Sequence, residues 1–337
     1  MSFYFNQTDR RQAVNSYTYY TGPDSSGERP SGSLYEERSY NRQKVASSAT
    51  LTYTPRLGDN HSLSIMGGWN IEDYTYKSNL MSREGIIIPG KPNFSLLEGE
   101  AMTLKDNGSY DWGLVGAFYR VSYSYKGKYL LEASGRYDGN SKFPSNQRWG
   151  FFPSGSVGWR ISEEPFFEGI REKFNNFKIR YSYGQLGNQN VGYYDYIRKI
   201  SIGNQNYLFG GDKPTTATIS APVASNLSWE TSIHNNLGVD MSFLNNRLAF
   251  SADFYIRDTK DMLTDGMALP GVYGADSPSM NSAELRTKGY ELSVSWRDQF
   301  KLAGKPFEYS VGFNLSDYKS VITKYDNNPN KSLTNLT

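Results

Sequence analysis

The side chains that come nearest to a hydrolytic site in this sequence are three pairs of adjacent carboxylates. A glycosidase needs two carboxyl groups that face each other across the scissile bond. Neighbouring residues of a β-strand instead point to opposite faces of a sheet. We therefore interpret these pairs as solvated strand ends; they are Glu36/Glu37, Glu72/Asp73 and Glu163/Glu164.

The other common routes to catalysis are absent from the sequence. It has no cysteine, which removes disulfides, thiolate catalysis and Cys-ligated zinc, and its two histidines, His61 and His234, cannot form an all-histidine metal site. No G-x-S-x-G elbow, Walker loop or H-E-x-x-H motif occurs. We expect a protein that is not an enzyme and that needs no metal or other cofactor.

The segment GRYDGNSKF, residues 135–143, is a candidate for calcium or sugar binding. Asp138 and Asn140 offer oxygens at alternate positions, but a calcium loop needs more carboxylates and a distal glutamate. Asp-Gly is also common turn chemistry. We favour a turn at the end of a strand.

Two runs of strict alternation that flank this segment carry the strongest structural signal. YLLEASGRYD, from Tyr129, places apolar or small residues at odd positions and polar ones such as Glu132 and Arg136 at even positions. WGFFPSGSVGWRIS, from Trp149, repeats this parity, so one face could meet lipid and the other water. Aromatic residues at each end of the stripe, including Trp149 and Trp159, are typical of strands that cross both membrane interfaces. The pattern predicts a membrane-scale β-hairpin.

The amino-acid composition is typical of a protein whose strands are apolar on one face only. Aromatic residues make up 15% of the chain, with 27 tyrosines, and the mean hydropathy is −0.63. The formal charge of +2 comes from 36 basic and 34 acidic residues without a basic block, so we expect no nucleic-acid partner. No apolar run approaches the roughly 20 residues of a membrane-spanning helix.

Similar alternation recurs along the chain and predicts about ten strands, close in length to the roughly 9 to 11 residues that a tilted membrane strand needs. The connections alternate between short and long, as in outer-membrane barrels. The short connections are residues 57–60, 126–128 and 245–246, with longer ones at 162–176 and 298–306; the long connections are 77–111, 139–148, 187–227 and 261–283. The predicted strands cover residues 35–54, 63–72, 115–126, 129–138, 149–162, 177–184, 233–243, 248–257, 290–297 and 307–316.

We therefore predict an all-β fold: an antiparallel transmembrane β-barrel segment of about ten strands, with short periplasmic turns and long extracellular loops. The alternative is a surface-exposed soluble all-β glycan-binding module or hydrolase. A soluble module would not keep aromatic-capped apolar stripes after every short turn, and a hydrolase would need a carboxylate pair that the sequence does not supply. A passive porin is a third possibility.

Parity also predicts the candidate functional residues. Charged residues of the polar parity should face the lumen, because a charge at mid-depth on the lipid side costs about 2 to 4 kcal/mol; they are Glu132, Arg136, Arg160, Lys178, Arg180, Glu230, Asp240, Asp253, Arg257, Glu291 and Arg297. The long loops carry aromatic residues that could contact a substrate or a partner, or could simply pack: Tyr193, Tyr194, Tyr196, Tyr207, Phe209 and Tyr273.

Several segments, in order, closely resemble the barrel of the SusC/RagA family of TonB-dependent outer-membrane importers. They are LLEASGRYDGNSKF, RWGFFPSGSVGWRISEE, KIRYSYGQLGNQN, NLSWETSIHNNLGVDMSFLNNRLAFSADFYIRDTKDML and ELRTKGYELSVSW. The resemblance disfavours the porin. It implies import of oligosaccharides or peptides through the bacterial outer membrane, with a SusD-like surface lipoprotein as a lid and energy from the TonB complex.

The resemblance also implies parts that the sequence does not contain. Family members have a signal peptide, a TonB-contacting segment, a plug and about 22 strands, so we expect residues 1–337 to form a partial barrel domain that lacks the signal peptide, the plug and the C-terminal strands. We then expect the charges of the polar parity to hold the plug and hydrate the lumen, or to contact substrate.

Overall fold

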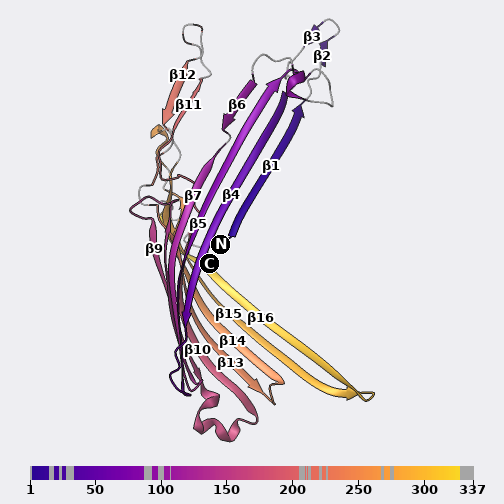
Figure 1. Ribbon diagram of the computed structural model, residues 1–337, viewed down its shortest axis with the longest axis vertical. Coiled ribbons are helices and arrows are strands. Elements are labelled where there is room, and N and C mark those ends of the chain that lie inside the picture. Colours follow the sequence, from indigo (N-terminus) through magenta and orange to yellow (C-terminus); the bar gives the residue numbers. More distant parts are fainter. Residues whose placement is uncertain are drawn as a thin grey trace. The chain divides into compact units, whose positions relative to one another are not determined.

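The computed structural model of the chain is nearly all β-structure (Figure 1). It describes residues 2–14, 19–22, 25–27, 34–86, 93–97, 102–106, 108–204, 209, 211, 214–219, 222–224, 227–266, 269–273 and 277–326. In these parts of the chain no helix is both long and apolar enough to cross a membrane.

A single antiparallel sheet contains most of the strands. Its order is β1-β4-β5-β7-β8-β9-β10-β13-β14-β15-β16, with β6 paired to β5, and two small hairpins, β2–β3 and β11–β12, stand apart from it. The strands are β1 (Ser2–Val14), β2 (Tyr19–Gly22), β3 (Ser25–Gly27), β4 (Leu34–Tyr53), β5 (His61–Glu84), β6 (Met102–Asp106), β7 (Tyr110–Tyr125), β8 (Tyr129–Asn140), β9 (Trp149–Arg160), β10 (Phe174–Asn188), β11 (Ile200–Asn204), β12 (Thr215–Ile219), β13 (Glu230–Phe243), β14 (Leu248–Asp265), β15 (Ser279–Leu302) and β16 (Lys305–Tyr325). Short 3-10 helices are η1 (Phe94–Leu96), η2 (Ile161–Glu163), η3 (Pro165–Ile170) and η4 (Gly271–Tyr273).

The chain divides into two compact units, Met1–Ser48 with Ile71–Leu114 and Ala49–Asn70 with Val115–Thr337. In the first unit, tyrosine rings pack across neighbouring strands: Tyr40 on Tyr76 at 6.3 Å and Tyr76 on Tyr110 at 4.7 Å between centroids. Such cross-strand aromatic pairs each stabilise a sheet by a fraction of a kcal/mol to about 1 kcal/mol. All the site residues discussed below belong to the second unit.

The register of the second unit places the apolar stripes of successive strands side by side. Ile179 of β10 pairs with Trp159 of β9 and with Val239 of β13, and Trp159 pairs with Tyr129 of β8. We call the face that carries these residues the apolar face and the opposite one the polar face. Large side chains of the apolar face are open to the surroundings; Val157, for example, is 50% exposed. The alternation read from the sequence is therefore a property of the whole sheet.

The shortest connections lie where the sequence predicts them. β7 ends at Tyr125 and β8 begins at Tyr129, and Lys126 and Gly127 between them have φ of 50° and 65°, the backbone of a tight hairpin turn. The turns that follow β4 and β13 also match their predicted positions. We call the end of the sheet that carries these turns the short-turn end and the opposite end the long-loop end.

The predicted connection at residues 298–306 is wrong. β15 continues to Leu302 and β16 begins at Lys305, so the turn consists of Ala303 and Gly304 with φ of 51° and 79°. Both values are positive, as a two-residue hairpin turn requires. The polar run RDQ before Phe300 hid the strand, because its side chains do not continue the apolar stripe.

The long connections are shorter than predicted, because the strands extend beyond the apolar stripes. β5 runs to Glu84 and is joined by β6, β14 runs to Asp265, and β15 begins at Ser279. The connection between β10 and β13 contains the β11–β12 hairpin. β1 was not among the predicted strands, yet it pairs with β4 along its full length.

Candidate functional site

The eleven charged residues singled out by parity share one face of the sheet. The register aligns Arg160, Lys178 and Asp240 in one row across β9, β10 and β13. The neighbouring row aligns Arg180 with Gly238 of β13, then Asp253 of β14 and Glu291 of β15. Residues two positions apart on a strand share its face, which brings Glu132, Arg136, Glu230, Arg257 and Arg297 to the same side. That this polar face lines the lumen stays a prediction.

Arg180 forms the densest charge network of the polar face. Its guanidinium donates to Asp253 at 2.6 Å and to Asp240 at 3.0 Å. Asn236 and Ser251 donate to the same two carboxylates at 2.7 and 3.1 Å. The network therefore joins β10, β13 and β14 by one cation and two anions.

Gly238 makes this network possible. It lies beside Arg180 on the middle strand of the three, and a Cβ at position 238 would overlap the guanidinium. The glycine leaves the arginine side chain a flat path across β13 to Asp253 on the next strand. A larger residue at this position would block that path.

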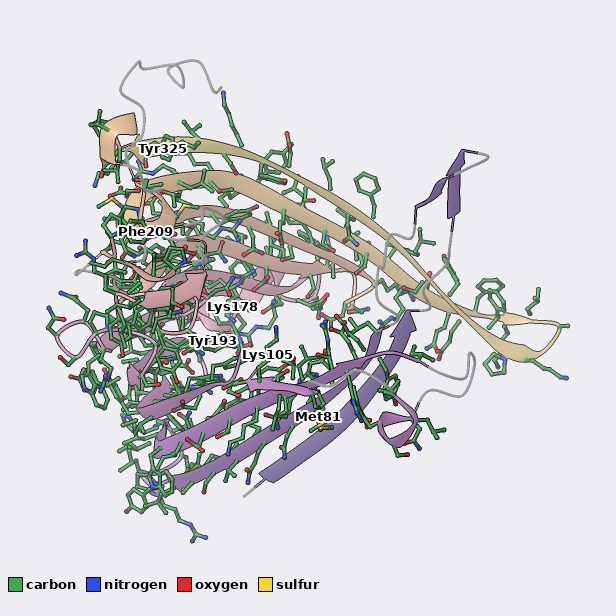
Figure 2. All side chains as sticks on the ribbon, turned by 90° about the horizontal axis from the view of Figure 1, so that it is seen from above. Met81, Lys105, Lys178, Tyr193, Phe209 and Tyr325 are labelled. Atoms are coloured by element: carbon green, nitrogen blue, oxygen red, sulfur yellow. The ribbon has the colours of Figure 1, made fainter. Side chains whose placement is uncertain are left out.

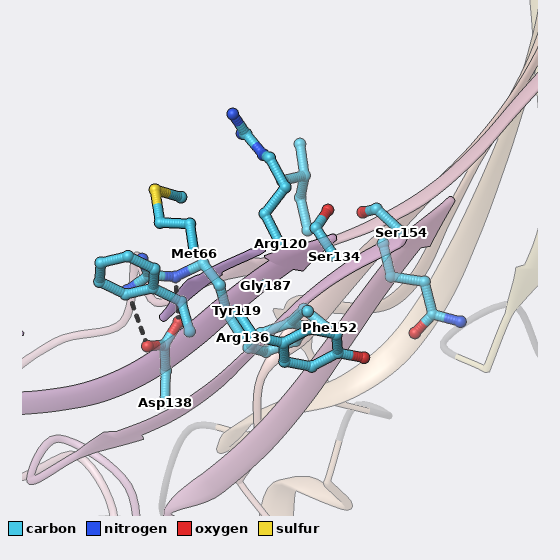
Figure 3. A pocket seen from close by; sticks show the side chains of 13 residues that line it. Met66, Tyr119, Arg120, Ser134, Arg136, Asp138, Phe152, Ser154 and Gly187 are labelled. Carbon is cyan, nitrogen blue, oxygen red and sulfur yellow. Dashed lines mark hydrogen bonds and ion pairs between the residues drawn. The ribbon is translucent and has the colours of Figure 1, made fainter. Parts of the chain in front are cut away.

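A second charged cluster surrounds Arg136 on β8. Its guanidinium donates to both carboxylate oxygens of Asp138 at 2.9 and 3.0 Å (Figure 3). It donates to the Asn70 amide oxygen at 2.9 Å. It also lies 5.2 Å from the centroid of the Phe118 ring, within the range of a cation–π interaction. These residues, apart from Asn70, line a cavity of about 380 Å³ that extends to Phe152 and Gly187.

The other charged residues of the polar face make smaller contacts. Glu132 accepts a hydrogen bond from Ser122 at 2.9 Å, and Glu230 accepts one from Asn188 at 3.1 Å. Glu291 lines a cavity of about 390 Å³ together with Asp253. Arg257 is in register with His234. Within the part of the chain that the structure describes, the side chains of Arg160, Lys178 and Arg297 form no ion pair.

The loop aromatics fall into two groups. Tyr193 and Tyr196 fold back on the loop that follows β8: the ammonium of Lys142 lies 4.6 Å from the Tyr193 ring centroid, and the Tyr196 hydroxyl donates to the Ser141 carbonyl at 3.4 Å. Tyr194 has a positive φ of 61°. Burial lowers the pKa of Lys142, because the charged form loses hydration.

Of the other three loop aromatics, the structure describes the side chain of Phe209 alone. Phe209 is 79% exposed (Figure 2). Tyr207 lies outside the described residues, and Tyr273 belongs to η4 but its side chain is not described. The structure therefore brings Tyr193 and Tyr196 to the loop after β8 and leaves Phe209 exposed.

A buried aromatic cluster at the long-loop end was not predicted. Phe143 is fully buried and packs on Trp229 at 4.9 Å between centroids, and Phe152 meets the same indole edge-on at 5.4 Å. The Trp229 Nε1 donates to the Arg148 carbonyl at 3.0 Å. We call Phe143, Phe152 and Trp229 the hub; Leu227, just before Trp229 in the sequence, is also buried. The sequence signal was the pair Leu227 and Trp229, which are two positions apart just before β13.

The segment that could have held calcium makes internal hydrogen bonds instead. Asp138 is engaged by Arg136, and the buried Asn140 side chain donates to the Gln189 side chain and accepts from the Lys142 N–H. The oxygens are thus committed to internal contacts. The strand-end interpretation fits this arrangement, in which the loop after β8 is tied to the loop after β10.

Comparison with known proteins places the chain in a family. The family model described as TonB dependent receptor-like, beta-barrel, matches residues 1–336. TonB-dependent receptor P3 of Formosa agariphila is 32% identical over 287 residues, which are 84% of this chain and 28% of that protein. TonB-dependent receptor SusC of Bacteroides thetaiotaomicron is 32% identical over 216 residues, 63% of this chain and 21% of that protein. The chain thus spans less than a third of the length of these curated relatives.

Solved structures share the fold. The RagAB peptide transporter aligns with a TM-score of 0.77 at 22% identity, over 96% of this chain and 34% of that one. The outer membrane transporter YddB from Escherichia coli aligns with a TM-score of 0.52 at 12% identity, over 94% of this chain and 39% of that one. The family consists of receptors and transporters rather than enzymes. The chain belongs to the TonB-dependent receptor family, is of the SusC/RagA type, and forms part of an outer-membrane β-barrel.

Proposed function

We propose that this chain forms part of the wall and outer rim of a TonB-dependent importer for oligosaccharides or peptides. The observation that carries the proposal is the division of the sheet into an apolar face and a face with organised charge, with aromatic loops at one end. Such a wall guides a polar solute past lipid and performs no chemistry on it. The polar face then lines the lumen, and its networks around Arg136 and Arg180 hold the plug and keep the passage hydrated.

The long-loop end is then the extracellular end. Barrels of the outer membrane keep short turns in the periplasm and long loops outside, and the loops between β8 and β9 and between β10 and β13 share one end of the sheet. There, an exposed Phe209 and the Tyr193–Lys142 pair present apolar rings with polar edges. Such rings stack on sugars and pack against peptides equally well.

The partners follow from this placement. A SusD-like surface lipoprotein would cover the long-loop end and deliver substrate to it, and the TonB complex would act on the plug from the periplasm. SusC is a curated relative, and the RagAB peptide transporter shares the fold. The second similarity supports the peptide class, whereas the oligosaccharide class and the lipoprotein lid rest on the resemblance to the SusC/RagA family.

Deletion of Tyr193 to Phe209 in the native outer membrane tests the proposal. We expect lid co-purification or growth on a glycan or peptide source to fall, while the barrel stays inserted, because the deletion removes no strand of the main sheet. It removes β11, which pairs with β12 outside that sheet. Leu57, in a short turn, is 46% exposed, and Leu57→Ser serves as the matched control that should change neither readout. Unchanged lid binding and growth in the inserted deletion variant would contradict the proposal.

Dependence on TonB distinguishes the importer from a passive porin. We expect uptake of the same substrate to stop when TonB is removed from the cell. Uptake that continues at the same rate without TonB would favour the porin.

A further inference from the structure

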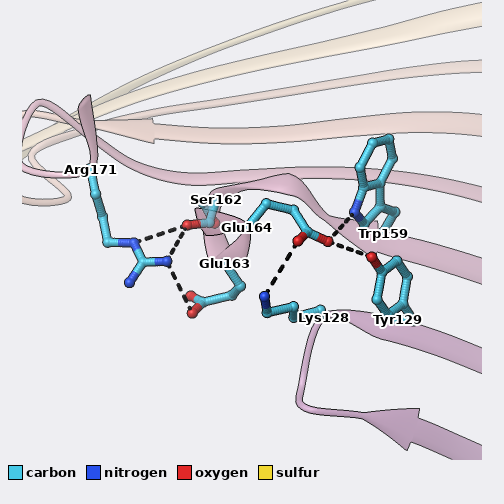
Figure 4. A network of polar contacts seen from close by, with 7 residues as sticks. All are labelled: Lys128, Tyr129, Trp159, Ser162, Glu163, Glu164 and Arg171. Atoms are coloured by element: carbon cyan, nitrogen blue, oxygen red, sulfur yellow. Dashed lines mark hydrogen bonds and ion pairs between the residues drawn. The ribbon is translucent and has the colours of Figure 1, made fainter. Parts of the chain in front are cut away.

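The connection between β9 and β10 is held against the apolar face of the sheet. Its Glu164 carboxylate accepts hydrogen bonds from the Tyr129 hydroxyl at 2.6 Å and from the Trp159 indole N–H at 3.1 Å, with the Lys128 ammonium at 3.3 Å (Figure 4). Tyr129 and Trp159 are register partners on the apolar face. A segment of η2 and η3 thus folds back onto the side of the sheet that carries the apolar stripes.

An aromatic contact fixes the same segment at a second point. Phe167 of η3 is only 7% exposed, and its ring lies 5.3 Å from Phe174 and 6.2 Å from Phe177. Phe177 pairs with Met241 two positions from Ile179 and so belongs to the apolar face. η3 therefore packs on the apolar face at the short-turn end.

Two large apolar side chains of η3 are left uncovered by this packing. Phe166 is 72% exposed and Ile170 is 54% exposed. Single exposed apolar residues are ordinary, but these two lie on one six-residue helix. They follow Glu164, the residue that binds the exposed Tyr129 and Trp159, and aromatic residues of these types mark the level of the lipid headgroups.

The segment is also held rigidly. Arg171 donates to the Ser162 carbonyl at 2.6 and 2.9 Å and pairs with Glu163 at 3.5 Å. The Lys173 carbonyl accepts from the Leu244 N–H of the next short turn at 3.0 Å. A surface that is already ordered loses little conformational entropy when it binds.

We propose that η2 and η3 form an interfacial anchor, in which Phe166 and Ile170 insert between the phospholipid headgroups of the leaflet at the short-turn end. The exposed pair continues the lipid-facing surface of a barrel that lies in the outer membrane. The charges around the segment nearly cancel, so binding depends on apolar area rather than on anionic lipid; they are Lys128, Arg171 and Lys173 against Glu163, Glu164, Glu168 and Glu172. The anchor is independent of the substrate that is imported.

Spin labels test the proposal directly, because the chain has no cysteine of its own. Phe166→Cys and Ile170→Cys are labelled in the receptor, which is reconstituted in phosphatidylethanolamine vesicles with or without phosphatidylglycerol. Asp59→Cys, in the exposed turn between β4 and β5, is the aqueous control. We expect the ratio of oxygen to nickel-chelate collisions to be several-fold higher at positions 166 and 170 than at 59, and unchanged by phosphatidylglycerol.

Two outcomes would overturn the anchor. Nickel access at 166 and 170 equal to that at 59 would place the segment in water. Low access to both probes, together with dipolar coupling between labels on separate molecules, would assign the patch to a second copy of the chain. Gly169→Cys, at a position where a side chain meets open space, repeats the measurement if either label disturbs packing.

Discussion

Arg180 shows how much of the polar face depends on single side chains. The guanidinium lies over Gly238 and bridges two carboxylates on two further strands, with about a third of the side chain exposed. Removing one partner of a buried ion pair costs about 3 to 5 kcal/mol, because the remaining charge is left uncompensated. Partial exposure reduces that cost through solvent screening.

We expect Arg180→Met to lower the free energy of unfolding by about 2 kcal/mol, since Asp240 and Asp253 lose their shared cation. Chemical denaturation of the receptor in micelles measures this. Arg297→Met, on the same face but without an ion pair in the described part of the chain, should change stability by less than about 0.5 kcal/mol. Adding Asp240→Asn and Asp253→Asn to Arg180→Met should restore part of the loss. Equal effects of the two arginine substitutions would contradict the role of the network.

Gly187 supports the hub in a different way, by leaving room for a ring. A Cβ at position 187 would overlap the buried Phe152 ring. We expect Gly187→Ala to destabilise the receptor by about 1 to 3 kcal/mol through overpacking. Gly203→Ala, where a Cβ meets open space, is the control, and Phe152→Leu should partly rescue Gly187→Ala. A neutral Gly187→Ala would show that the ring can move aside at no cost.

At the scale of elements, the turn between β15 and β16 is less favourable than it could be. Ala303 has a φ of 51°, and the left-handed region costs an L-residue roughly 1 to 2 kcal/mol, less for asparagine. We expect Ala303→Asn to raise the free energy of unfolding by about 0.5 to 1 kcal/mol and Ala303→Val to lower it by about 1 kcal/mol. Thermal unfolding of the receptor measures both changes. If Ala303→Asn and Ala303→Val both stabilised or both destabilised the receptor, the positive φ at this position would be contradicted.

The segment of η2 and η3 should respond to acid through Glu164. Hydrogen bonds from Tyr129 and Trp159, and then the contact with Lys128, lower the pKa of this carboxyl. A pKa lowered by folding contributes stability that is present above the ordinary carboxyl pKa of about 4.3 and is lost as the pH falls through the lowered value. The other charged groups around the segment are Lys128, Glu163, which pairs with Arg171, Glu168, Glu172 and Lys173.

We therefore expect a spin label at Glu168→Cys to become more mobile only when the pH falls below the ordinary pKa of a carboxyl group, because folding lowers the pKa of Glu164. In the Glu164→Gln background the label should be mobile already at neutral pH and respond less to acid. A pH response that is identical in both backgrounds would assign the transition to another group.

At the scale of the whole chain, strict alternation was enough to predict most of the membrane strands. The bounds of β8 and β9 were predicted to within two residues, because every second side chain of a strand that faces lipid must be apolar or small. Where the apolar stripe stops, the predicted strand ends too early. The strands of the structure run on, to Glu84 in β5 and to Leu302 in β15. A strand in water pairs by its backbone and needs no apolar stripe, so its sequence carries a weaker signal.

The candidate site, too, could be predicted from the sequence only in part. The charges of the polar face followed from parity alone, but their pairing did not, since it needs a register: Arg180 reaches Asp253 only because Gly238 lies between them. The hub joins Trp229 to the carbonyl of Arg148, 81 positions apart in the sequence. Contacts of that range are set by loop packing and leave no periodicity to read.

The most direct test of the account is the orientation of the two faces in the native outer membrane. Single cysteines at Val157, Val239 and Phe250 on the apolar face, and at Arg160 and Glu291 on the polar face, are treated with a lipid-soluble and with a water-soluble maleimide. The account predicts that the lipid-soluble reagent modifies the first set and spares the second, and that the water-soluble reagent does the reverse. Preferential modification of positions 160 and 291 by the lipid-soluble reagent, with the first set spared, would contradict it.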